Sequence, residues 1–164
     1  MPQVPFAEMP DHARLWVFAA ERDLTPAERD AVLRTVDAFL AGWAAHGAPL
    51  TAARDLRYDR FLLVAVDERA AGVSGCSIDA LTRQLRQLER QFALALLDNA
   101  PVHFRLGPAV ERASRARFRE LAESGTVSPA TIVFDNTAAT VGAVRQGHWE
   151  TEAHRTWVAR AFFA

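Results

Sequence analysis

Apolar residues follow two patterns along the chain, and the two patterns predict different secondary structures. Continuous apolar runs at residues 14–20 and 61–66 are typical of strands that are buried on both faces. Elsewhere apolar positions recur every three or four residues, which is the spacing of one face of a helix. Residues 50–58 and 101–106 are also predicted to be strands, so four strands are expected, at residues 14–20, 50–58, 61–66 and 101–106.

Two helices are predicted between these strands. The first begins at Thr25-Pro26-Ala27-Glu28, where Thr25 is the N-cap, Pro26 lies in the first turn and Glu28 follows three residues after the cap. The second begins at Ser77. The apolar stripes are Val32, Val36, Phe39, Leu40 and Trp43 in the first helix, and Ile78, Leu81, Leu85, Leu88, Phe92 and Leu96 in the second.

The order strand, helix, strand, strand, helix, strand is that of the split β-α-β, or ferredoxin-like, fold, which belongs to the α+β class. In this fold the four strands form one antiparallel sheet with the spatial order 4-1-3-2, and both helices cover the same face. We expect residues 13–107 to form this core, preceded by an N-terminal arm at residues 1–12.

Residues 108–164 are expected to form a C-terminal α/β extension, because they are too few to build a core of their own. They read as a helix at 115–123, a strand at 131–134 and a short helix near 138–146. The first and third strands are apolar on both faces, so something must cover the sheet face that the helices leave open. The extension is the predicted cover, which makes residues 1–164 a single domain. A homodimer through the open face is the alternative.

Charge and composition exclude several classes of function. The net charge of −1 gives no overall attraction to nucleic acid or to an anionic membrane. All 19 basic residues are arginine, so a Schiff-base lysine and a phosphate-loop lysine are both excluded. The single cysteine, Cys76, allows no internal disulfide, and the N-terminus has no signal-peptide pattern. We therefore expect a soluble cytoplasmic protein without membrane contact.

The first candidate site is the segment that leads into the second helix. Backbone N–H groups and the helix dipole favour an anion at a helix N-terminus, and they lower the pKa of a thiol there. An anion or ligand nest would use Ser74, Gly75, Cys76, Ser77 and Asp79. A thiol enzyme would instead use Cys76 as nucleophile, with His46 or His12 as the nearby base. The remaining interpretation is a capped turn in which Cys76 packs as a small apolar residue.

The second candidate is a group of arginines that could contact phosphates. Arg83, Arg86 and Arg90 share one stripe of the second helix, and a second cluster after the fourth strand contains Arg112, Arg115, Arg117 and Arg119. RNA contact through Arg112, Arg115 and Arg119 is one reading. A solvated face paired with Glu89, Glu111 and Glu120 is the other, and the negative net charge favours it.

Two further groups complete the candidates. If residues 148–154 are extended, His148, Glu150, Glu152 and His154 point the same way and could hold Zn²⁺, although their spacing matches no known ligand motif. Asp135-Asn136-Thr137 follows a predicted strand, where it could bind a ligand or cap a helix. The tryptophans are expected in the core or at its edge. No cofactor motif is present.

Several segments together resemble one protein family. They are Val4-Pro5-Phe6, Arg14-Leu15-Trp16-Val17, Arg57-Tyr58-Asp59-Arg60-Phe61, Ala65-Val66-Asp67-Glu68, Ser74-Gly75-Cys76-Ser77-Ile78-Asp79 and Thr131-Ile132-Val133-Phe134-Asp135-Asn136. They resemble a family of small bacterial proteins, common in Bacteroidetes, that genomes often label "ABC transporter ATPase". The resemblance covers nearly the whole chain, and residues 74–79 are its most specific part. The family has a Trp-His pair near its end where this chain has Trp157-Val158, which weakens any role for a terminal histidine.

The label of that family does not fit this chain, because a transporter ATPase needs a glycine-rich phosphate loop that ends in Lys-Ser or Lys-Thr. The resemblance therefore implies no particular activity. We expect a non-enzymatic binding or interaction module, with an anion or ligand site around Ser74–Asp79. A small thiol-dependent enzyme built on Cys76 is the alternative, and RNA contact through the arginines is a weaker one.

Overall fold

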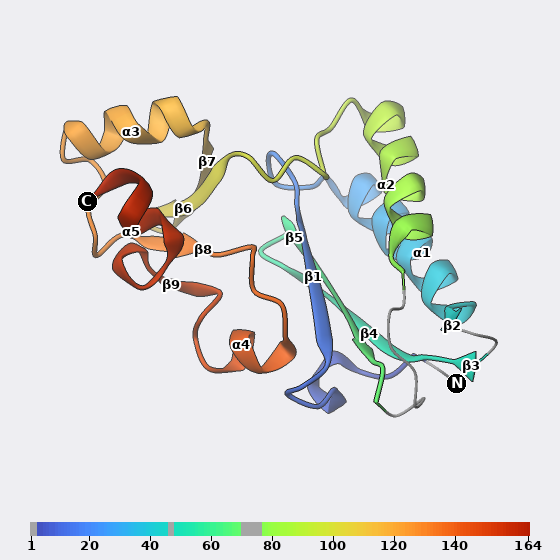
Figure 1. The fold of residues 1–164 in the computed structure, drawn as a ribbon. Helices are drawn as coiled ribbons and strands as arrows, with labels where there is room; N and C mark the ends of the chain where they lie inside the picture. Colours follow the sequence, from blue (N-terminus) through green and yellow to red (C-terminus); the bar gives the residue numbers. More distant parts are fainter. Residues whose placement is uncertain (1–2, 46–47, 70–76) are drawn as a thin grey trace.

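The computed structural model describes residues 3–45, 48–69 and 77–164 and shows a mixed α+β protein with two larger antiparallel sheets (Figure 1). The first sheet has three strands in the order β1-β5-β4, which are Arg14–Ala19, Phe61–Asp67 and Thr51–Arg57. β4 and β5 form a hairpin whose turn residues Tyr58 and Asp59 both have positive φ, as tight hairpin turns require. The predicted order of the first three strands, 1-3-2, is confirmed.

The two predicted helices are present and lie on the same face of this sheet (Figure 1). α1 is Pro26–Ala41 and α2 is Asp79–Phe92. The predicted start of α1 is confirmed, because Thr25 Oγ1 accepts a hydrogen bond from Glu28 N at 3.2 Å and the Glu28 carboxylate accepts one from Thr25 N at 2.8 Å. Hydrogen bonds from Arg22 and Thr25 lower the pKa of Glu28 to about 2.

The fourth predicted strand does not join the first sheet, so the predicted four-stranded order 4-1-3-2 is wrong. That strand, β6 (Val102–Leu106), pairs instead with β7 (Ala109–Ala113) and β8 (Ile132–Phe134), and β9 (Glu150–Glu152) completes a sheet with the order β7-β6-β8-β9. Gly107, with φ of 62°, and Pro108 form the turn that folds β7 back onto β6.

Besides the pairing of β6 with β7 and β8, a second feature keeps β6 away from β1. Another segment partly occupies the outer edge of β1, where the fourth strand was predicted to pair. Leu15 N donates a hydrogen bond to Ala139 O at 2.9 Å, and Val141 N donates to Ala13 O at 3.0 Å. The segment before α4 (Val141–Arg145) therefore takes the place that the ferredoxin-like fold gives to its fourth strand.

The apolar face that the helices leave open is covered by the chain itself, in part by the C-terminal extension, as predicted, and in part by the N-terminal arm. On the helix side, Leu62, Val64 and Val66 pack against the apolar stripes of α1 and α2. On the opposite side, Leu63 and Ala65 belong to a buried cluster with residues from both ends of the chain: Met9, Phe134, Val141 and Trp149. The exposed apolar face that motivated a homodimer is thus accounted for within one chain.

The C-terminal elements surround the second sheet (Figure 1). The predicted helix at 115–123 is α3 (Arg115–Glu123), and α5 (Trp157–Phe162) packs beside it, since the Phe118 ring lies 5.2 Å from Phe104 and 4.9 Å from Phe162. The remaining short elements are η1 (Phe6–Glu8), β2 (Ala44–Ala45), β3 (Ala48–Pro49) and η2 (Ala153–Arg155). Among the described residues, no helix is both long and apolar enough to cross a membrane.

Candidate functional site

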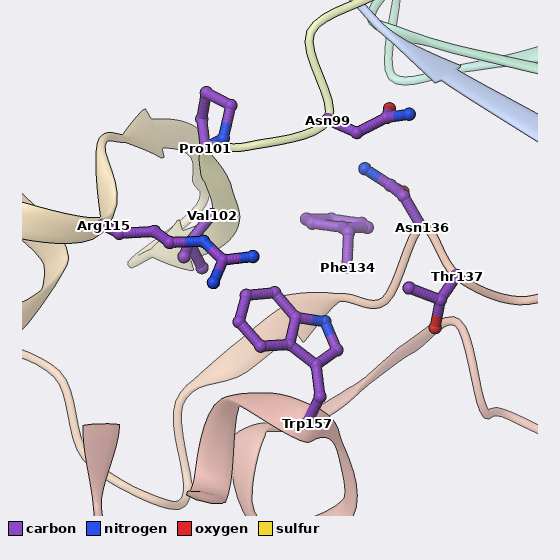
Figure 2. A pocket seen from close by; sticks show the side chains of 8 residues that line it. All are labelled: Asn99, Pro101, Val102, Arg115, Phe134, Asn136, Thr137 and Trp157. Carbon is purple, nitrogen blue, oxygen red and sulfur yellow. The ribbon is translucent and has the colours of Figure 1, made fainter. Parts of the chain in front are cut away.

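A cavity of about 320 Å³ opens where the start of β6 meets the end of β8. Antiparallel pairing of these strands, with Phe104 opposite Val133, brings the residues before β6 next to the loop after β8. The first turns of α3 and α5 close the other sides. The lining residues are Asn99, Pro101, Val102, Arg115, Phe134, Asn136, Thr137 and Trp157 (Figure 2).

Two aromatic side chains form apolar walls of this cavity. Phe134 is held rigidly by the cluster behind it, because the Phe61 ring stacks on it at 4.5 Å and the Trp149 ring lies 5.2 Å away. Trp157 is half-buried at the start of α5, where the Arg115 guanidinium lies 4.8 Å from the centroid of its ring. The apolar walls suit a flat ring, and their positions are fixed by the protein core.

Hydrogen-bond donors face the cavity from two sides. Asn136 Oδ1 accepts a hydrogen bond from Trp149 Nε1 at 2.9 Å, which fixes the orientation of the amide and turns its NH₂ group toward the cavity (Figure 2). Arg115 Nε donates to Ala100 O at 3.3 Å, and the terminal guanidinium nitrogens extend into the space between Val102 and Trp157 (Figure 2). Arg115 has no acidic partner within 4.0 Å among the residues that the structure describes.

The polar side chains that line the cavity are two amides, one hydroxyl and one guanidinium. None of the eight lining residues is a carboxylic acid, a histidine or a cysteine. The Thr137 hydroxyl donates to the Asp135 carboxylate, which also accepts from Thr137 N at 3.1 Å. Asp135 therefore closes a local turn in the loop after β8, and the cavity itself presents mainly donors, which select ligands with acceptor atoms.

The cavity unites parts of two candidates from the sequence. Asn136 and Thr137 come from the group after the predicted strand, and Arg115 comes from the arginine cluster. The helix-capping alternative for Asp135–Thr137 is wrong, because α4 is capped by Thr140, whose Oγ1 accepts from Ala143 N at 3.1 Å. Asn99 and Trp157 were not predicted for this site, since an exposed loop asparagine and a tryptophan near the C-terminus carry no distinguishing pattern.

The other arginines of the cluster do not accompany Arg115. Arg112 forms ion pairs with Glu21 at 3.5 Å and Asp98 at 3.4 Å. Arg119 donates to Ala161 O at 3.4 Å and lies over the Phe162 ring. Arg117 pairs with Glu120 at 2.9 Å, as the solvated-face reading predicts. The Glu89 carboxylate, in contrast, accepts from the backbone amides of Leu96 and Leu97 and makes no ion pair with the described arginines.

Most of the predicted anion nest lies outside the described residues, as do Cys76 and His46. Within the described part, Ser77 Oγ accepts from Asp79 N at 3.1 Å, and the Asp79 carboxylate lies in the first turn of α2. A carboxylate in that position already interacts with the helix dipole and repels a second anion. The other histidine considered for the thiol, His12, pairs with Asp67 at 3.1 Å.

The four residues considered for Zn²⁺ do not converge. Glu150 accepts hydrogen bonds from the Tyr58 hydroxyl and from Arg105, the latter at 3.2 Å. Glu152 pairs with His154 at 2.5 Å, and His148 is exposed. No group of three or more histidine, cysteine, aspartate or glutamate side chains that could hold a metal ion occurs in the described part of the chain, which contains all four residues.

A buried histidine lies where the second sheet meets the end of the first. His103 on β6 is 2 % exposed, and its ring lies 5.5 Å from the Phe61 ring. Burial, with the positive charges of Arg112 and Arg60, lowers the pKa of His103 to about 4. The Ala20 backbone opposes this shift, but neither ring nitrogen makes a well-formed hydrogen bond within the described residues. His103 is therefore neutral at pH 7 and is not part of the cavity.

Comparison with known proteins adds no identification. No protein-family model, no curated protein and no solved structure matches the chain.

Proposed function

We propose that the protein binds a small, flat ligand with hydrogen-bond acceptors on its edge, and that the ligand occupies the cavity between β6, β8, α3 and α5. One observation carries this proposal. The Asn136 NH₂ group and the Arg115 guanidinium face the same cavity beside the rings of Phe134 and Trp157 (Figure 2). An apolar cavity with a few converging polar groups is the usual form of a small-molecule site.

The donors are held in place before any ligand binds. The Asn136 amide is fixed by Trp149, which is itself 1 % exposed, and Arg115 is fixed by Ala100 O and the Trp157 ring. Preorganised donors lose little side-chain entropy on binding, which raises affinity for a ligand that matches them. The proposed site belongs to the binding-module class that the sequence suggests, but it lies away from the start of α2.

Fragment screening by NMR tests the proposal. A set of flat aromatic carboxylates, amides and heterocycles is added to the ¹⁵N-labelled protein, and the Arg115 Nε–H, Asn136 NH₂ and Trp157 indole N–H signals are followed. We expect the binding fragments to shift these three signals together. Binding fragments that cluster on another surface, or a set in which none shifts these signals, would contradict the proposal.

A further inference from the structure

A second hollow, of about 460 Å³, adjoins the cavity described above. Trp157 lines both spaces, and Asp135 in the hollow directly precedes Asn136 in the cavity. The hollow is also lined by His154, Arg155 and Arg160. A ligand that packs against Trp157 in the cavity therefore needs only a short linker to reach the hollow.

The hollow favours an anion because positive side chains outnumber negative ones among the residues that line it. Arg155 and Arg160 are exposed and make no ion pair within 4.0 Å among the described residues. The one acidic side chain of the hollow, Asp135, already accepts two hydrogen bonds from Thr137. His154 is paired with Glu152. Two guanidinium groups thus remain for a ligand, and guanidinium groups bind phosphate oxygens through paired hydrogen bonds.

We infer that the ligand is a flat ring compound joined to a phosphate group, with a nucleoside monophosphate as the class that fits. This inference rests on the proposed function of the cavity. The base packs between Phe134 and Trp157, where Arg115 and Asn136 donate to acceptors on its edge. The sugar passes Trp157, and the phosphate contacts Arg155 and Arg160. The guanidinium fork of Arg115 matches the adjacent O6 and N7 acceptors of guanine.

Calorimetric titration with guanosine and with guanosine monophosphate separates the two spaces. We expect the monophosphate to bind about tenfold more tightly, or more, because charge-assisted hydrogen bonds to Arg155 and Arg160 are added. The double variant Arg155→Gln/Arg160→Gln should bind the monophosphate no better than guanosine, with guanosine affinity unchanged. Both arginines are on the surface, so the variant should fold normally.

A charge-matched variant, Arg83→Gln/Arg86→Gln on the exposed face of α2, controls for general electrostatic attraction and should retain the tenfold difference. Equal affinity for the two compounds, no binding of either, or a difference that survives in the double variant or disappears in the control overturns the inference. The proposed function is judged separately by the fragment signals at Arg115 and Asn136. Ring fragments that bind there without any gain from phosphate overturn only the inference.

Discussion

Acid is expected to destabilise the fold through one buried side chain, His103 on β6. Its pKa is lowered from 6.5 to about 4 in the folded protein by burial and by the charges of Arg112 and Arg60. In the unfolded chain the imidazole is solvated and returns to the ordinary value near 6.5. Below that pH the unfolded state binds a proton that the folded state does not, so stability falls as the pH falls from about 6.5 toward about 4.

The size of this effect follows from the two pKa values. Between pH 7 and pH 5, a shift from 6.5 to about 4 removes about 2 kcal/mol from the free energy of unfolding. Below about pH 4 the folded state also binds the proton, and the loss levels off. His103→Phe removes the titrating group and keeps an aromatic ring against Phe61. The polar contact that it gives up is the weak one with the Ala20 backbone, because neither ring nitrogen makes a well-formed hydrogen bond among the described residues. The variant should therefore be at least as stable as the wild type at pH 7.

Urea unfolding at pH 7 and pH 5, followed by tryptophan fluorescence, measures the effect. Other groups also titrate in this range, so the quantity of interest is the difference in pH dependence between wild type and variant. We expect the wild type to lose about 2 kcal/mol more than His103→Phe. His148→Gln, at an exposed histidine, is the matched control and should follow the wild type. Equal pH dependence for the wild type and His103→Phe would refute the reasoning.

Three further predictions concern the fold and its surface. Gly142→Ala places a Cβ 3.0 Å from Asp11 O and should lower the free energy of unfolding in urea by about 1–3 kcal/mol, whereas the Cβ of Gly42→Ala has nothing within 4 Å and should lower it much less. Equal losses for the two variants would contradict the close packing of α4 on the N-terminal arm. Truncation after Gly107 removes Phe134, Val141 and Trp149 from the open sheet face, so the product should aggregate or fail to fold cooperatively by circular dichroism. A truncated protein that folds cooperatively would disprove that the C-terminal extension is needed to cover this face. Binding to single-stranded RNA at physiological salt should be weaker than about 10⁻⁶ M in a fluorescence anisotropy titration, because Arg112 and Arg119 have partners of their own and Arg115 lines the cavity. Tight, salt-sensitive binding would reverse that conclusion.

Local signals in the sequence predicted the first part of the fold well. The Thr25 capping box and the helical stripes depend on residues close together in the chain, and the structure shows the capping box and most of both stripes as expected. Trp43 and Leu96, the last residue of each predicted stripe, lie after the ends of α1 and α2. The position of β6 depends on which segments pair with β6 and which segment pairs with the edge of β1, and local sequence patterns do not encode that choice. Gly107-Pro108 allows a hairpin between β6 and the neighbouring β7, and residues 139–141, far along the chain, occupy the edge of β1. A local turn and a distant pairing therefore both act to keep β6 out of the first sheet.

The cavity was only partly predictable for the same reason. Asn136 and Arg115 were singled out by residue type and position, but they belong to different elements, and nothing in their spacing shows that they face each other. Trp157 was expected in the core or at its edge, and its ring is half-buried, but no pattern in the sequence shows that it forms part of a cavity wall. Such a site is created by the antiparallel pairing of β6 and β8, which the sequence-based interpretation did not include.

The most direct test of the binding site replaces the NH₂ group of one side-chain amide in the cavity. Asn136→Asp keeps the oxygen that accepts from Trp149 Nε1, but replaces the NH₂ group that faces the cavity with a carboxylate oxygen. The affinity of the best ring fragment is measured by NMR titration for the wild type, for Asn136→Asp and for Arg117→Gln, a control on the exposed side of α3. We expect at least about tenfold weaker binding to Asn136→Asp, because a donor is lost and a negative charge faces the ligand's acceptors, and unchanged binding to the control. Equal affinity for the wild type and Asn136→Asp would contradict the assignment of this cavity as the ligand site.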